Sequence, residues 1–359
     1  MKSLDVGLQK RKAGIPSDLS ENGQASEQRV FREKFDPRDY IQTYYPESID
    51  TPLLLRVLQG MHGRHPSANI DIRDLAANVD ISHETAENLL IFDFQRVVAK
   101  NVLKAFPRDH INVLDVGGGP TIYQHIAISL EAGSITHSEF LEQNRDEAQK
   151  WVSDAEGAYN WDAYLNLMQK MLQNDPEYQD ILNQQTQSEE EQIRSHALQV
   201  KNIIESPDIT ELKKYVRERL NGHIVHGDVF QSDLGMRNQN RYDVVNSSSR
   251  ESSAEVITSN FTVESATGDR SVWERGMRNI MGKVKPGGFL ALTAIRNAEW
   301  YKVGEEKMPA VKIDEGDITS ICKEGGFQMQ ELRILKGSHK ETVGYDGMIF
   351  VLARKNGET

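Results

Sequence analysis

Three consecutive glycines, Gly117, Gly118 and Gly119, follow an apolar run at residues 111–114 and precede an apolar helical pattern at residues 126–130. A strand, a glycine turn and a helix in this order let the backbone come close to a nucleotide-like ligand. Glycine suits the turn because it adopts positive φ and has no side chain that blocks the approach. This stretch therefore predicts a binding site for a nucleotide-like small molecule.

Two acids further along the chain are suited to the polar parts of such a ligand. Glu139 lies about 20 residues beyond the turn, at the end of the second predicted strand, where nucleotide-binding α/β domains place an acid that accepts from ribose hydroxyls. Phe140 is suited to stack on the base, and Asn144 to begin the next helix. Asp228 follows the third predicted strand, with Val229 next to it, where a carboxylate accepts from an adenine amino group. The structural alternatives are a surface acid for Glu139 and a loop cap for Asp228.

The spacing within the turn separates two kinds of cofactor. The dinucleotide fingerprint, G-x-G-x-x-G/A, needs a third small residue where the helix packs on the strand. After Gly117 and Gly119 that place holds Ile122. The mismatch disfavours a nicotinamide dinucleotide and leaves S-adenosylmethionine as the predicted cofactor. A Pro-Gly-Gly turn at residues 286–288 leads into a later strand, as the sheet of a methyltransferase requires.

Composition limits the classes of function. The chain has 359 residues, enough for a sizeable core, and carries a formal net charge of -12. An acidic chain gains no counterion-release affinity for a phosphate backbone, so we expect no nucleic-acid partner. The lone Cys322 forms no intramolecular disulfide and is a poor metal ligand, so we expect no metal. The sequence shows no secretory signal and no apolar run of about 18 residues, so we expect no membrane partner and a cytoplasmic protein.

From residue 111 onward, β-rich runs alternate with helical patterns. This alternation predicts an α/β fold with a doubly wound, seven-stranded, Rossmann-like sheet of the methyltransferase type. The last two runs are joined by a short connection, so we expect the final strand to be antiparallel. The predicted strands cover residues 111–116, 134–138, 223–226, 242–246, 288–295, 328–335 and 347–353.

The remaining segments surround this sheet. Residues 1–30 are polar without periodicity and are predicted to be a disordered tail. Residues 31–106 are predicted to form a helical cap, with Asp36 as the N-cap of its first helix. Residues 107–359 then form the cofactor-binding domain. Within it, residues 161–220 are polar and helix-rich, and we expect a helical insertion near one edge of the sheet that covers the active site.

With these features in place, the chain resembles the nicotinamide, phenylethanolamine and indolethylamine N-methyltransferase family of class I S-adenosylmethionine-dependent methyltransferases. Order and spacing match over roughly residues 31–355, apart from insertions near 50–75 and 165–215. Four blocks carry the resemblance: residues 35–45 (FDPRDYIQTYY), residues 115–124 (DVGGGPTIYQ), residues 139–161 with Gln143, Asn144, Lys150, Trp151 and Trp161, and residues 285–290 followed by Trp300, Tyr301, Gly304, Glu305 and residues 351–355.

The resemblance also implies which residues hold the cofactor. Tyr40 and Tyr45 would close over it from the N-terminal helix, and Ser248 would contact its methionine end. The remaining cofactor contacts would come from Gly117, Gly118, Gly119, Thr121, Tyr123, Glu139, Phe140, Asn144, Asp228 and Val229. We assign catalytic positions to Tyr40, Ser248 and Ser249.

The acceptor side departs from the family. Where its members use acids soon after the fifth strand, this chain has Ala294, Asn297 and Ala298. The loop predicted to follow the fourth strand, residues 246–253, is longer and more polar than an aromatic-amine pocket needs; a plain serine linker is the structural alternative. The candidates for substrate contacts are Asn246, Ser247, Arg296 and Tyr301.

The leading hypothesis is an enzyme that methylates a small molecule on nitrogen by in-line displacement, which depends on close alignment. The alternative is a cyclase of the azetidine-2-carboxylate synthase type. In that reaction the α-amine of S-adenosylmethionine attacks its own γ-carbon and methylthioadenosine is released. The lost acids, the serine-rich loop and the lid-like insertion motivate it. A non-catalytic, partner-binding relative fits less well, because the cofactor residues are intact. We expect a monomer or a homodimer.

Overall fold

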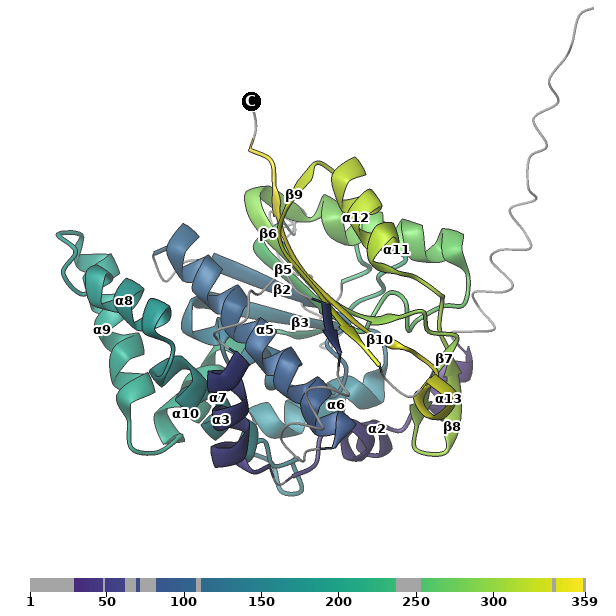
Figure 1. Ribbon diagram of the computed structural model, residues 1–359, viewed down its shortest axis with the longest axis horizontal. Coiled ribbons are helices and arrows are strands. Elements are labelled where there is room, and N and C mark those ends of the chain that lie inside the picture. The colour runs from purple at the N-terminus through teal and green to yellow at the C-terminus, as the bar shows by residue number, and fades with distance from the viewer. Residues whose placement is uncertain are drawn as a thin grey trace, which may run out of the picture.

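The computed structural model describes residues 29–47, 49–61, 69–71, 82–107, 111–236, 253–337 and 340–357. Its centre is an eight-stranded sheet with helices on both faces (Figure 1). In spatial order the strands are β1 (Asn69–Asp71), β9 (Phe327–Lys336), β10 (Gly347–Lys355), β6 (Val284–Arg296), β5 (Ala254–Asn260), β2 (Ile111–Val116), β3 (Ala132–Glu139) and β4 (Ile224–His226).

The strand directions confirm the predicted fold class. β2 runs parallel to β3 and β5, and β5 runs parallel to β6. β10 is antiparallel to both of its neighbours, β6 and β9. The sheet is therefore doubly wound with an antiparallel last strand, as expected. It has eight strands rather than seven because β1 adds a short parallel strand beside β9.

One predicted strand was placed wrongly. The position between β2 and β6 belongs to β5, whereas we expected the fourth strand at residues 242–246, which lie outside the described residues. Val256, Ile257 and Thr258 give β5 its β-branched character, and all three are buried. The loop after the fourth strand therefore begins at Phe261, and this shifts the residues that face the cofactor site.

The N-terminal helices begin at the caps that the sequence predicts. The Asp36 carboxylate accepts from two backbone N–H groups at the start of α2 (Pro37–Tyr44). Ser82 accepts from the N–H of Thr85 at the start of α5 (His83–Ala105). Helix α5 shares its apolar core with the sheet and contacts β6 and β10. The domain boundary near residue 107 stays a prediction.

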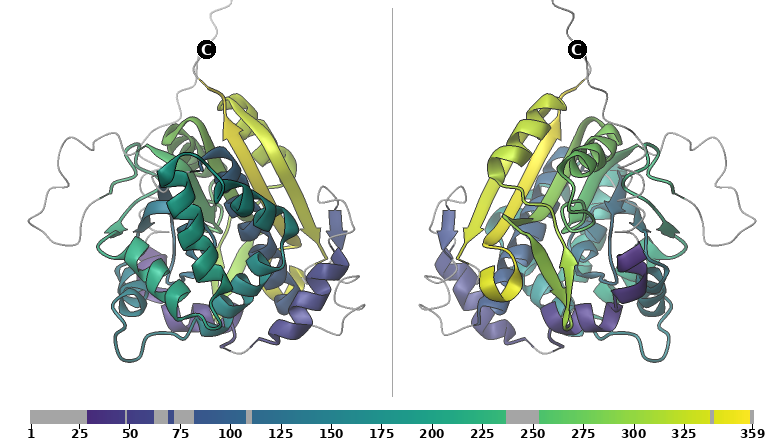
Figure 2. Two further views of the ribbon diagram at one scale, coloured as in Figure 1. Left: turned by 90° about the vertical axis from the view of Figure 1, so that its left-hand side faces the viewer. Right: turned by 90° about the vertical axis from the view of Figure 1, so that its right-hand side faces the viewer.

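The helical insertion exists, but it does not cover the cavity described below. It comprises α7 (Asp162–Gln173), α8 (Pro176–Gln185), α9 (Glu191–Glu205) and α10 (Thr210–Leu220). These helices pack on α5 and β3, and no residue of 161–220 lines the cavity. The prediction that the insertion covers the active site is therefore wrong. In Figures 1 and 2, α8 and α9 lie at the opposite end of the molecule from the ribbon of β7 (Trp300–Val303) and β8 (Glu306–Pro309).

The remaining elements complete the two helical layers. They are α3 (Thr51–Met61), η1 (Tyr123–His125), η2 (Ile128–Leu130), α6 (Glu142–Val152), α11 (Arg270–Gly282), α12 (Glu315–Glu324) and α13 (Lys340–Val343). Among the described helices, none combines the length and the hydropathy that spanning a bilayer requires.

Candidate active site

A cavity lies beyond the carboxyl ends of β2, β3, β4 and β5. This is the place where open parallel sheets bind ligands, because the connections after neighbouring strands diverge there. Helix α2 and the N-terminal part of α5 supply further wall residues from the other side. The cavity therefore joins segments that are far apart in the sequence.

The glycine turn forms one wall of the cavity. Gly117 and Gly119 have φ values of +68° and +65°, which residues with side chains rarely adopt. A Cβ at Gly117 would lie only 2.0 Å from Cγ2 of Thr262. The N–H groups of Gly117 and Gly118 donate to the carbonyl of Ser138, at 2.7 and 3.1 Å. All three predicted glycines line the cavity, and so do Thr121 and Tyr123.

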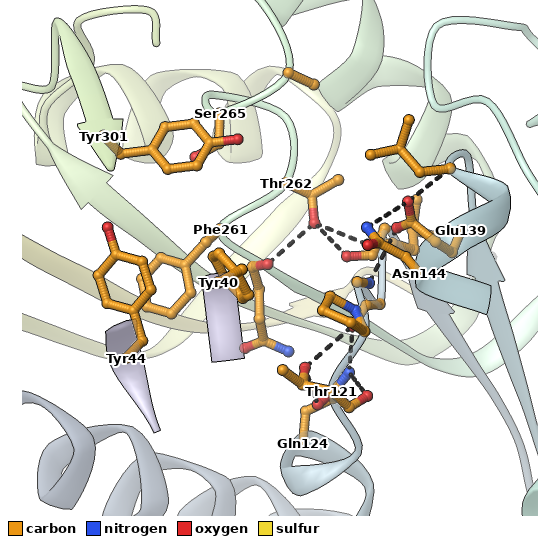
Figure 3. A pocket seen from close by; sticks show the side chains of 18 of the residues that line it. Tyr40, Tyr44, Thr121, Gln124, Glu139, Asn144, Phe261, Thr262, Ser265 and Tyr301 are labelled. Atoms are coloured by element: carbon orange, nitrogen blue, oxygen red, sulfur yellow. Dashed lines mark hydrogen bonds between the residues drawn. The ribbon is translucent and has the colours of Figure 1, made fainter. Parts of the chain in front are cut away.

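Glu139 ends β3 and faces this turn (Figure 3). Its Oε2 accepts from the N–H of Gly119 at 3.0 Å. Its Oε1 accepts from the N–H of Leu141 at 2.8 Å and from Nδ2 of Asn144 at 3.2 Å. Burial raises the pKa of the Glu139 carboxyl, and the donors at Leu141 and Gly119 oppose that rise. Acid, turn and helix α6 are thus held as one unit.

Asn144 supplies an acceptor that the protein leaves unused. Its Oδ1 is buried and has no hydrogen-bond partner among the described residues, and the side chain lines the cavity. Next to it, the carboxylate of Glu139 retains lone pairs beyond those its three donors occupy. This end of the cavity therefore suits a ligand that brings hydroxyl donors, such as a ribose.

Asp228 and Val229 line the same cavity after β4. The Asp228 carboxylate also accepts from the N–H of Phe230 at 3.0 Å and from Nε2 of Gln231 at 3.2 Å. The loop-capping alternative thus describes part of what Asp228 does. Phe140, the predicted stacking residue, lines the cavity too, and the guanidinium of Arg32 lies 4.8 Å from its ring centroid.

Tyrosines from α2 and the residue after it cover the cavity. The rings of Tyr40 and Tyr44 have centroids 5.1 Å apart, and Tyr45 stacks on Tyr123 at 4.7 Å. The hydroxyl of Tyr44 donates to the carbonyl of Lys302 at 3.0 Å. Burial raises the pKa of each of these tyrosines well above its ordinary value. Their hydroxyls therefore stay neutral and able to donate.

The cavity residues that follow β5 were not among the site residues predicted from the sequence. Phe261, Thr262 and Ser265 line the cavity, and Figure 3 shows Thr262 between Tyr40 and Glu139, with Phe261 beside Tyr44 and Ser265 beside Tyr301. The Thr262 hydroxyl lies 3.0 Å from the carbonyl of Val116, so it ties this loop to the glycine turn. The available signal was the β-branched run at residues 256–258, which marks the strand just before them.

Glu264 is a buried acid of the same loop. It is 3% exposed, and its Oε1 accepts from the N–H of Ile295 at 3.0 Å. Burial raises the pKa of its carboxyl to about 7, and the backbone N–H of Ile295 opposes that rise. Glu264 therefore titrates near neutral pH.

A second acid reaches the cavity from α5. Glu87 is 6% exposed, and its Oε2 accepts from the hydroxyl of Tyr345 at 3.0 Å. Met348, Ile295 and Tyr301 line the cavity as well, so the carboxylate shares it with apolar and aromatic side chains. Glu87 thus brings an acid from α5 into the cavity, whereas the predicted acceptor positions after the fifth strand hold no acid.

The other predicted site residues divide into three groups. Tyr301 lines the cavity, as expected. Arg296 does not line it, because its guanidinium pairs with Glu315 at 2.8 Å and with Asp346 at 2.7 Å. The predicted residues Asn246, Ser247, Ser248 and Ser249 lie outside the described residues.

Comparison with known proteins gives a consistent assignment. Residues 80–356 match the model of the NNMT/PNMT/TEMT family. Human phenylethanolamine N-methyltransferase is 26% identical over 250 residues, which cover 68% of this chain and 73% of the relative. Rabbit (Oryctolagus cuniculus) indolethylamine N-methyltransferase is 23% identical, covering 90% and 95%. Human nicotinamide N-methyltransferase is 21% identical, covering 76% and 88%.

Proposed function

The chain belongs to the NNMT/PNMT/TEMT family and is an S-adenosylmethionine-dependent methyltransferase, and we propose that it methylates a nitrogen atom of a small molecule held in the cavity. One observation carries the proposal. The same cavity has an acceptor-rich end at Glu139 and Asn144 and an aromatic end at Tyr44 and Tyr301 (Figure 3), and the acid Glu87 lines it as well.

The residues present fit the cofactor. Glu139 and the unpaired Oδ1 of Asn144 are suited to accept from the two ribose hydroxyls. The glycine turn leaves room for the methionine portion, since Gly119 lines the cavity and a Cβ there would meet nothing within 4 Å. We propose that Asp228 and the N–H of Val229 bind the adenine edge.

When bound, S-adenosylmethionine supplies an electrophilic methyl group on a sulfonium sulfur. The protein's own contribution is alignment and the exclusion of water. The buried rings of Tyr45 and Tyr123 and the half-buried ring of Tyr40 form an aromatic cover over the glycine turn. We propose that the Tyr40 hydroxyl contacts the reacting end of the ligands, because Tyr40 lines the cavity.

We assign acceptor recognition to Glu87. A carboxylate with little solvent access binds an ammonium or a polarised N–H group more strongly than an exposed one does, because screening is weak there. The hydroxyl of Tyr345 fixes its orientation. Helix α5 thus supplies the charge that Ala294, Asn297 and Ala298 do not.

The direct test is a product assay by mass spectrometry with the full chain. We expect S-adenosylhomocysteine and a methylated amine when a panel of aromatic and aliphatic amines is added, and neither product with Glu139→Ala. Methylthioadenosine formed without any acceptor would instead establish the cyclase alternative, which the comparisons do not favour over methyl transfer. The expected cytoplasmic location, the monomer or homodimer, and the lack of a nucleic-acid partner stay predictions.

A further inference from the structure

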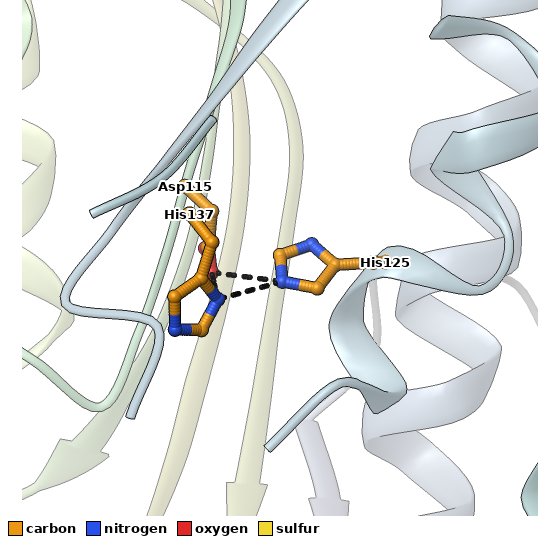
Figure 4. A group of neighbouring side chains, drawn as sticks. All are labelled: Asp115, His125 and His137. Carbon is orange, nitrogen blue, oxygen red and sulfur yellow. Dashed lines mark hydrogen bonds and ion pairs between the residues drawn. The ribbon is translucent and has the colours of Figure 1, made fainter. Parts of the chain in front are cut away.

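Two histidines and an aspartate meet beneath the glycine turn, outside the cavity lining (Figure 4). Asp115 belongs to β2, His125 to η1 and His137 to β3, and all three are 0% exposed. The Nε2 of His125 lies 3.0 Å from Nδ1 of His137 and 3.4 Å from Oδ2 of Asp115. The third separation, between His137 Nδ1 and Asp115 Oδ2, is 3.6 Å.

The buried carboxyl of Asp115 lacks an arginine or lysine partner among the described residues, and this is the first argument for a bound cation. Its oxygens accept from Oγ1 of Thr258 at 2.7 Å and from Nε2 of Gln124 at 3.1 Å, and both donors are neutral. By contrast, the buried Asp93 pairs with Arg96 at 2.7 Å and Arg333 at 2.6 Å. Buried carboxylates are normally paired with a cation or bind a metal. Among the described residues Asp115 has no arginine or lysine as a partner.

The geometry is the second reason. Separations of 3.0, 3.4 and 3.6 Å define a triangle whose three corners each lie about 2 Å from a common central point. Zinc–nitrogen and zinc–oxygen bonds in proteins have this length. We propose that Asp115 Oδ2, His125 Nε2 and His137 Nδ1 bind one zinc ion beneath the glycine turn. This replaces the sequence-based expectation that no metal is bound.

The surroundings orient two of the three donors as in known zinc sites, while Nδ1 of His125 has no hydrogen-bond partner among the described residues. Nε2 of His137 lies 3.0 Å from the carbonyl of Gly119, so its proton belongs there and the lone pair of Nδ1 is free to ligate. Thr258 donates to Oδ1 of Asp115, and Oδ2 accepts from Nε2 of Gln124 and keeps a further lone pair for the ion.

The ion would join three elements that position the cofactor turn. β2 leads into Gly117, β3 ends at Glu139, and η1 follows directly after the turn. A bound ion adds its binding free energy to the folded state only, so metal loss should loosen the turn and weaken cofactor binding. The site is independent of the methyl acceptor.

The experiment uses the full, untagged chain purified without chelator. We expect about one zinc per chain by plasma mass spectrometry and, after chelation, a one-to-one calorimetric titration with Zn²⁺ alone. Co²⁺ in its place should give the visible absorption of a nitrogen- and oxygen-ligated tetrahedral ion. His125→Gln and His137→Gln should each weaken Zn²⁺ binding at least a hundredfold.

The control is His196→Gln. His196 is also buried but faces only the single acid Glu131, at 3.8 Å, so Zn²⁺ affinity should not change. No metal and no Co²⁺ absorption in the wild-type protein would overturn the proposal and leave a hydrogen-bonded pair of neutral imidazoles. Undiminished binding in both histidine variants would also overturn it. The wild-type Co²⁺ spectrum is decisive even if a variant does not fold.

Discussion

The carboxylate of Glu139 accepts a 3.0 Å hydrogen bond from the backbone N–H of Gly119, so the end of β3 and the glycine turn form one continuous wall of the cavity. Twenty positions of sequence separate the two groups. The other oxygen of the same carboxylate accepts hydrogen bonds from the N–H of Leu141 and from Nδ2 of Asn144. Glu139 therefore positions the turn, and it is also the residue that we propose binds the ribose.

Glu139→Ala should weaken S-adenosylmethionine binding about tenfold to a hundredfold, because a charged acceptor contributes about 1.5–3 kcal/mol through its hydrogen bonds. Isothermal titration calorimetry measures the change. Glu142→Gln, an exposed acid three residues later on α6, is the control and should bind normally. Unchanged affinity in Glu139→Ala would remove Glu139 from the site.

Gly117→Ala should destabilise the protein by more than a positive-φ glycine substitution normally does. A Cβ at Gly117 meets Thr262, whereas one at Gly222, with a φ of +78°, meets nothing within 4 Å. Gly222→Ala should therefore show the backbone cost alone, roughly 1 kcal/mol. Urea denaturation measures both variants, and equal losses would mean that the Thr262 contact relaxes at little cost.

The buried carboxyl of Glu264 should make the free energy of unfolding depend on pH. Its folded-state pKa, about 7, lies above the ordinary value of 4.5, so its contribution is fully present below about pH 4.5 and is lost as the pH rises through 7. Between pH 5 and pH 8, the wild-type protein should lose roughly 3 kcal/mol of unfolding free energy relative to Glu264→Gln. Urea denaturation of both proteins across this range checks the difference, and parallel pH profiles would contradict it.

Glu87→Gln should raise the KM for a cationic amine acceptor about tenfold or more, because a buried charge-assisted hydrogen bond is lost. The KM for S-adenosylmethionine should change little. Glu341→Gln, an exposed acid on α13 that does not line the cavity, is the control. Steady-state kinetics with both substrates varied separate the effects, and an equal rise in both variants would place the acceptor elsewhere.

Tyr40→Phe should lower kcat more than it lowers stability, because the ring contacts with Phe35 and Tyr44 remain while the hydroxyl is lost. Single-turnover rates and thermal unfolding measure the two effects. A matched loss of both would assign Tyr40 a packing role. Thr43→Val, on the exposed side of the same helix, should leave the rate unchanged.

Features that follow from neighbouring residues were predictable. The β2 strand, the glycine turn and the cap at Asp36 came from local pattern, because periodicity and positive φ act over a few residues. Glu139 was also found, since parallel strands bring their carboxyl ends to one edge of the sheet. The fourth strand was placed wrongly because the sequence has two β-rich runs, at residues 242–246 and 254–260. Their residue pattern alone does not show which of them lies between β2 and β6.

The sequence by itself determined the fold class, the cofactor and most of the residues that we propose hold it, because strand order and turn chemistry are encoded in short segments. Only the tertiary structure brought Glu87 to Tyr345 across 258 positions, and Asp115 to His125 and His137 beneath the turn. Such contacts between residues distant in the sequence depend on how helices and strands pack against one another. Residue spacing does not encode that packing. The acceptor acid and the histidine cluster are therefore properties of the folded chain.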